Sequence, residues 1–174
     1  MRSMRRSVTV LLAATLLLGV VACEKIPKVP KPSSDSTPPT LKWHVENQTT
    51  NVATDVVGSG TVSGKVGNDF RVTLIANDPE GIANITLGGG YSRSCVSGGA
   101  AQNATGSYTK QDQSLAPDAQ GNVLTQIFLI RSVSPDVTCS GGYTLKSYTV
   151  GLNGTGTNYF SGTTNGTLTI TITP

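Results

Sequence analysis

The last stretch of the sequence alternates strictly between apolar and polar residues. Leu168, Ile170 and Ile172 occupy every second position, and threonine fills the positions between and beside them. Side chains repeat with a period of two along a strand and 3.6 along a helix. This stretch can therefore bury one continuous apolar face only as a β-strand.

The same period recurs upstream. Leu41, Trp43 and Val45 alternate with polar residues, which predicts a half-buried strand with the tryptophan pointing inward. No stretch of ten residues shows helical three-four spacing without glycine or β-branched crowding. Pro79 and Gly81 place a turn at 77–81. Further strands are predicted at 60–66, 70–76, 82–87, 106–111, 122–133 and 143–152.

Two stretches lack this simple alternation of apolar and polar residues. Residues 88–107 are rich in glycine, serine and small polar residues, which predicts a long loop with at most a short strand. Residues 127–130 are apolar on both faces, which predicts a central strand covered on both sides, or one that crosses between sheets.

Seven or eight short strands separated by turns predict an all-β fold, an antiparallel β-sandwich. The segment from Val72 through Asn77-Asp78-Pro79-Glu80-Gly81 into the next strand resembles the B-to-C connection of bacterial immunoglobulin-like and fibronectin type III-like modules. That resemblance implies an immunoglobulin-like sandwich. The disulfide and tryptophan positions of antibody domains are not matched, because Trp43 lies on the first strand. A small jelly roll is the alternative.

Residues 1–22 contain three arginines, an apolar run from Val8 to Val21 and small residues before a cysteine, the layout of a secretory signal peptide. Val20-Val21-Ala22-Cys23 resembles the lipobox of bacterial lipoproteins. The resemblance implies that Cys23 becomes an acylated N-terminus, which carries a diacylglycerol thioether and usually a third acyl chain such as palmitate. Two or more acyl chains hold a protein stably on a membrane.

Residues 23–40 follow as a proline-, lysine- and serine-rich tether, leaving 41–174 as a single domain. Proline favours an extended polyproline II course, about 3 Å per residue. Glu24 stands where an aspartate would imply retention in the inner membrane, so the resemblance implies the outer membrane, or the outer face of the cell membrane where only one membrane exists.

The net charge of +3 comes from 13 basic and 10 acidic residues, and three of the arginines belong to the leader. Removing the leader leaves ten of each sign, so the composition gives no case for nucleic-acid binding.

With Cys23 acylated, Cys95 and Cys139 remain as an even pair in an exported chain, which favours a disulfide. A pair of metal-binding thiolates is the alternative, although no other soft ligands lie nearby.

The sequence contains few residues that could form a catalytic site, and we expect no cofactor. His44 is the only histidine, and no Gly-x-Ser-x-Gly motif accompanies it. The carboxylate pairs Asp78 with Glu80 and Asp112 with Asp118 lie in polar turns, where nothing would raise a pKa. Asp78 and Glu80 are candidate calcium ligands, but two acids are too few for a complete site.

Two surfaces could serve recognition. Tyr91 and Tyr108 border the segment 88–107, and Tyr159 and Phe160 lie in the turns at 151–166. Tyrosines among small polar residues suit contacts to a protein or a glycan. The sequence thus predicts a non-catalytic binding or adhesion module anchored in the cell envelope. The alternative is a structural or assembly component of the envelope without a dedicated ligand.

Overall fold

The computed structural model describes residues 37–174, and this range contains ten strands and no helix. The signal peptide, Cys23 and most of the predicted tether lie outside the described residues. Residues 37–174 hold no helix that is long and apolar enough to cross a membrane. The strands are β1 (Thr40–Asn47), β2 (Val52–Val57), β3 (Gly60–Lys65), β4 (Phe70–Asn77), β5 (Ile82–Ser97), β6 (Ala100–Ser107), β7 (Gln111–Ser114), β8 (Gln126–Val133), β9 (Thr144–Asn158) and β10 (Thr163–Thr173).

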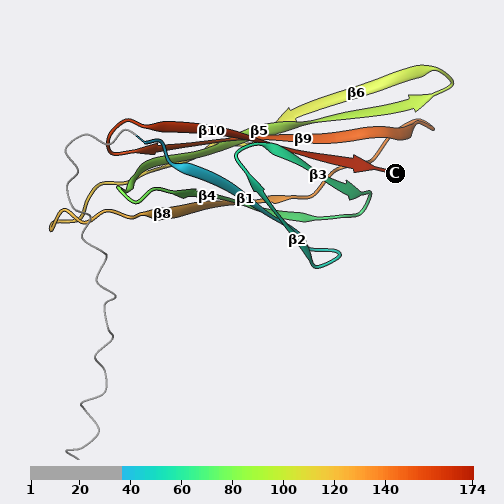
Figure 1. Ribbon diagram of the computed structural model, residues 1–174. Helices are drawn as coiled ribbons and strands as arrows, with labels where there is room; N and C mark the ends of the chain where they lie inside the picture. The colour runs from blue at the N-terminus through green and yellow to red at the C-terminus, as the bar shows by residue number, and fades with distance from the viewer. Residues whose placement is uncertain (1–36) are drawn as a thin grey trace, which may run out of the picture.

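These strands form a β-sandwich, as the sequence predicts (Figure 1). One sheet has the order β2-β1-β4-β8, and the other has the order β3-β10-β9-β5-β6, with β7 pairing the first part of β5. The structure has ten strands rather than seven or eight. The sequence pattern predicts no strand at β2 and does not separate β6 from β7. Pairing is antiparallel except between β3 and β10, which run parallel.

The core lies between the sheets, where alternate residues of facing strands meet. Trp43 and Leu74 are fully buried, and the Trp43 Nε1 donates to the carbonyl oxygen of Gly58 at 2.9 Å. Gly154 on β9 is required here, because a Cβ at that position would lie 2.7 Å from Leu74 and 3.0 Å from Trp43. The C-terminal strand buries every second residue, as its alternation predicts.

The turn after β4 carries the chain from the four-stranded to the six-stranded sheet. Gly81 takes a positive φ of 95°, and its N–H donates to the Asp78 carbonyl at 3.1 Å. A B-to-C connection in an immunoglobulin-like sandwich also passes between sheets.

The prediction of a loop at 88–107 is wrong. β5 continues without interruption to Ser97 and returns as β6, so this segment is a hairpin that projects past the body of the sandwich (Figure 1). Small polar residues and glycine are typical of loops, but here β9 pairs with β5 on its other side as far as Val96. Backbone hydrogen bonds from both neighbours hold a sequence whose side chains bury little.

The prediction of a strand at 106–111 is also wrong. β6 leaves β5 at Ser107, and β7 rejoins it at Gln111, opposite Leu87. Residues 108–110 lie in neither strand, although the N–H of Tyr108 still donates to the Gly89 carbonyl at 2.8 Å.

The prediction for 127–130 fails as well, because β8 is an edge strand that, among the described strands, pairs only with β4. Ile127 and Val133 face the core, whereas Phe128 on the opposite face is 58% exposed. The sequence predicts a strand covered on both sides because the outward face of β8 also carries apolar residues.

Candidate functional site

Three tyrosines gather on the inner face of the six-stranded sheet, where β5 and β9 extend toward the hairpin. The rings of Tyr91 and Tyr148 stack with centroids 5.5 Å apart and an interplanar angle of 8°. Tyr108 lies tilted against Tyr91 at 6.1 Å. Register explains the grouping, because Tyr148 on β9 pairs with Arg93, two residues beyond Tyr91 on β5. Gly106 leaves room for the Tyr91 ring, since a Cβ there would lie within 3 Å of three of its atoms.

Arg131 reaches this cluster from the facing sheet. Its guanidinium carbon lies 5.2 Å from the centre of the Tyr108 ring, a cation–π arrangement. One terminal nitrogen donates to the carbonyl oxygen of Thr109 at 2.6 Å. The Arg131 Nε is buried without a hydrogen-bond partner among the described residues. Partial burial lowers the pKa of Arg131, although the group stays charged at neutral pH.

The surroundings of Tyr108 and Tyr148 also change the pKa of their phenol groups. Burial is the main cause that raises the pKa of Tyr108 and of Tyr148 above the ordinary tyrosine value. Tyr108 raises the pKa of Tyr148 further, through its charge and a side-chain hydrogen bond. Both hydroxyls are therefore neutral at physiological pH and serve as hydrogen-bonding groups rather than bases.

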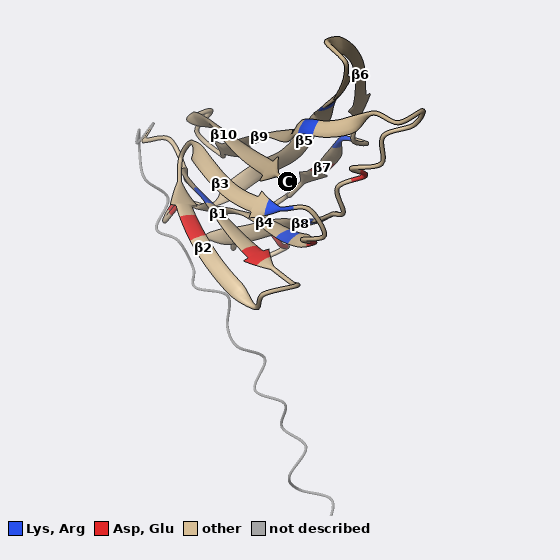
Figure 2. Ribbon diagram, turned by 90° about the vertical axis from the view of Figure 1, so that its right-hand side faces the viewer, with Lys and Arg blue, Asp and Glu red and all other residues tan. Residues whose placement is uncertain are grey.

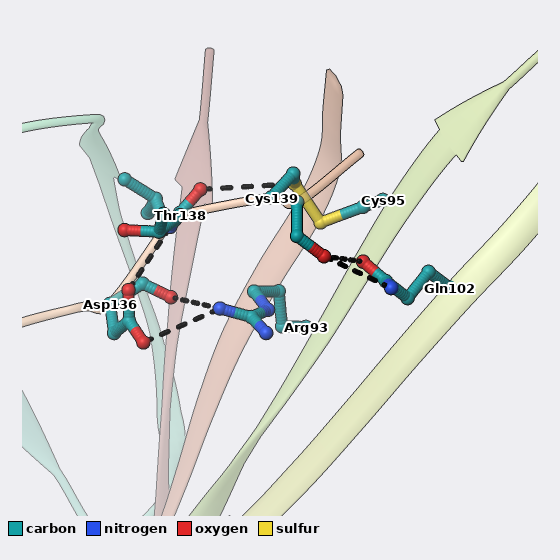
Figure 3. Close-up of polar contacts among 8 residues, drawn as sticks. Arg93, Cys95, Gln102, Asp136, Thr138 and Cys139 are labelled. Carbon is teal, nitrogen blue, oxygen red and sulfur yellow. Dashed lines mark hydrogen bonds and ion pairs between the residues drawn. A yellow bond between two sulfur atoms is a disulfide. The ribbon is translucent and has the colours of Figure 1, made fainter. Parts of the chain in front are cut away.

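A second set of contacts fixes the segment 134–143 against the hairpin (Figure 3). Cys95 on β5 and Cys139 form a disulfide with their Cα atoms 6.0 Å apart, the pairing predicted from the sequence. Arg93 lies beside it, with Nη1 3.4 Å from the Asp136 Oδ2 and 3.4 Å from its carbonyl oxygen. On the far side, Gln102 of β6 donates to Ser140 Oγ at 3.3 Å.

Asp136 connects the ion pair to the backbone of its own segment. Its Oδ1 accepts a hydrogen bond from the N–H of Thr138 at 3.1 Å. Hydrogen bonds from Thr138 are the main cause that lowers the pKa of Asp136. The disulfide, the ion pair and the Gln102 contact together place an ordered surface next to the tyrosines.

The structure separates the four predicted recognition residues into two places. Tyr91 and Tyr108 lie together beside Arg131. Tyr159 and Phe160 lie in the turn between β9 and β10, at the opposite end of the sandwich (Figure 1). Sequence reasoning missed Tyr148, Arg93 and Arg131. The alternation in β8 and β9 places Arg131 and Tyr148 on inward faces, and this was the available signal.

The calcium candidates belong to the turn at 78–81. Asp78 is 3% exposed; its Oδ1 accepts from the N–H of Glu80 at 2.8 Å, and its Oδ2 accepts from Asn158 Nδ2 at 3.1 Å. Across residues 37–174 no group of three or more His, Cys, Asp or Glu side chains is arranged to hold a metal ion.

His44 lies on the outer face of the four-stranded sheet. Its Nδ1 is 2.7 Å from Asp55 Oδ1, and its Nε2 is 3.7 Å from Glu46 Oε1. Lys42 completes the cluster through a 3.2 Å contact to Asp55. The hydrogen bond from His44 is the largest cause that lowers the pKa of Asp55.

Asp112 and Asp118, the candidate acid–base pair, both have lowered pKa values, which favour their charged forms. The pKa of Asp112 is lowered first by Asn84, and that of Asp118 first by Asn122. A general acid requires the opposite shift.

No protein-family model matches the chain, and no curated protein sequence matches it.

Proposed function

We propose that this chain is an exported lipoprotein, anchored through Cys23 to the outer membrane or to the outer face of a single cell membrane, and that its non-catalytic sandwich binds a protein or a glycan. The observation that supports it is the separation between the entry of the tether and the tyrosine–arginine cluster.

The described chain enters the domain at one end. The Thr37 carbonyl accepts a hydrogen bond from Asn158 Nδ2 at 2.8 Å, and the Pro39 carbonyl accepts one from the Thr164 hydroxyl at 2.5 Å. Asn158 is the last residue of β9, whereas Tyr148 lies ten residues earlier on the same strand. Ten residues of strand span about 33 Å. A chain held by residue 23 therefore presents the tyrosines at the end away from its anchor.

The chemistry of that end suits recognition. Tyrosine and arginine are enriched among the residues that dominate binding energy at protein interfaces. A half-buried tyrosine ring also supplies an apolar face with a polar rim, which fits the alternating C–H and hydroxyl groups of a sugar. The disulfide and the Arg93–Asp136 pair hold the neighbouring segment in place, which reduces the ordering cost of binding.

Site-specific photo-crosslinking in the exporting cell tests the binding end. A photoreactive residue at Tyr108 should give adducts with an envelope protein or with glycan. The same residue at Phe160, an aromatic position at the opposite end, is the matched control. Adducts at both positions alike, or at neither, would contradict a binding end far from the anchor.

The anchor is tested separately by Cys23→Ala. This variant should lose its acyl mass and leave the membrane fraction, with Ser33→Ala as the control in the tether. Retention of Cys23→Ala in the membrane fraction would contradict the lipid anchor while leaving the binding end untouched.

A further inference from the structure

β6 is a free edge of the six-stranded sheet. Within residues 37–174 it pairs only with β5, and its residues are exposed except for Ala104 and Gly106, which are partly covered. The N–H of Tyr108 donates to the Gly89 carbonyl at 2.8 Å, which fixes which backbone groups face β5. Because hydrogen bonding alternates along an antiparallel strand, even-numbered residues of β6 bond to β5. The N–H and C=O groups of the odd-numbered residues point outward, namely Ala101, Asn103, Thr105 and Ser107.

β6 also differs from the other edge strands of the described domain. Native sheets protect their edges with charges, proline, bulges or short strands. The remaining edges each carry a charged residue: Asp55 on β2, Lys65 on β3, Asp112 on β7 and Arg131 on β8. β6 is eight residues long, with no charged residue and no proline (Figure 2).

We propose that β6 pairs in antiparallel fashion with β6 of a second copy of this chain. Hydrogen-bonded pairs must join the outward-facing residues, so the two-fold axis passes through a residue rather than between two. With Ala104 on the axis, Ala101 pairs with Ser107 and Asn103 with Thr105 of the other copy. All four outward residues of each strand are then used, giving about eight new backbone hydrogen bonds.

The composition of β6 favours a second copy over other occupants. Apart from Gln102, which bonds to Ser140, its side chains are short, and none carries a charge that would select an oppositely charged peptide. Affinity must therefore come from the main chain, and an identical strand gives matched length with no charge repulsion. The chain's own tether is a poor partner, because Pro27, Pro30 and Pro32 lack the N–H that a ladder requires.

The direction of pairing has a consequence for anchored molecules. β6 runs along the long axis of the sandwich, and the chain enters at the end away from the hairpin (Figure 1). Antiparallel pairing therefore places the two Thr37 ends at opposite ends of the pair. Where both copies are anchored as proposed above, the pair would join two facing surfaces. This consequence rests on the proposed anchor, whereas the pairing itself does not.

Thiol crosslinking of the full-length protein tests the register. Ala104→Cys places two thiols across the axis, where facing Cα atoms of a non-hydrogen-bonded pair are about 4.5 Å apart. A short bis-maleimide should convert it to a covalent dimer. Ala101→Cys is the matched control, because residues 101 of the two copies lie about 20 Å apart in this register. Equal yields from the two variants, or no dimer from Ala104→Cys, would overturn the proposal.

A second substitution tests the free edge directly. Asn103→Pro, added to Ala104→Cys, removes an outward N–H without removing a hydrogen bond to β5. We expect at least a tenfold loss of crosslinked dimer, whereas Asn103→Ala should leave the yield unchanged. An undiminished yield with Asn103→Pro would overturn the proposal. If circular dichroism shows that the proline variant is unfolded, Thr105→Lys replaces it, with the same expected loss and the same contradicting result.

Discussion

Removal of the Cys95–Cys139 disulfide should destabilise the domain by an amount that the structure allows to be estimated. The bridge joins residues 44 apart in sequence. In the chain-entropy model, closing a loop of that size lowers the entropy of the unfolded chain enough to stabilise the fold by about 4 kcal/mol. Cys95→Ala with Cys139→Ala should therefore lower the free energy of unfolding by about that amount.

The loss should be uneven across the molecule. Cys95 is fully buried, and the segment 134–143 is also held by Val137, which packs against the core, by the Arg93–Asp136 pair and by the Gln102–Ser140 hydrogen bond. The two polar contacts are exposed and contribute little by themselves. Without the bridge, amide exchange should become fast in 134–143 first, whereas the strand β1, which surrounds Trp43, should stay protected until global unfolding.

Urea unfolding of the full chain, followed by Trp43 fluorescence, provides the measurement. The two-alanine variant should show a lower midpoint and a steeper slope, because the unfolded chain without the bridge is less compact, and its melting temperature should fall by roughly 10–15 °C. Ser94→Ala with Ser140→Ala is a matched control beside the bridge and should shift the midpoint only slightly. A loss below 1 kcal/mol, or early exchange throughout β1, would refute the view that the bridge closes a long loop in the unfolded chain.

Three further predictions concern packing and pH. Gly154→Ala should cost about 1–3 kcal/mol in urea unfolding, because its Cβ would overlap Leu74 and Trp43, whereas Gly151→Ala meets open space and should cost far less; equal losses would contradict this account. The pKa values of Asp55, Asp112, Asp118 and Asp136 are all lowered, so stability present above about pH 4 should decline as the pH falls below that value; a melting temperature that rises on acidification would contradict it. The pKa values of Tyr108 and Tyr148 are raised, so the unfolded chain ionises first and stability should fall as the pH rises above about 10, and Tyr148→Phe should reduce that alkaline loss; an identical alkaline decline in the variant would argue against burial as the cause.

Only part of the candidate site can be predicted from the sequence. The pattern located Tyr91 and Tyr108 and paired Cys95 with Cys139, because aromatic residues and an even cysteine count are visible without coordinates. It did not place Arg131 against Tyr108, since their contact joins strands from opposite sheets. It also gave no relative position for the two recognition surfaces, which lie at opposite ends of the domain.

What the sequence by itself determined is the fold class and the faces of the strands. Strict alternation, as in β1 and β10, fixes which side chains are buried, because a strand has only two faces. What only the tertiary structure decided is the pairing of strands that alternation does not mark. The segment 88–107 is a hairpin because β9 offers hydrogen bonds to β5 along most of its length, and β8 is an edge because no other strand of the described domain pairs with its far side. Backbone hydrogen bonds between distant segments leave no trace in the side chains, so β6 and its open edge became visible only in the folded domain.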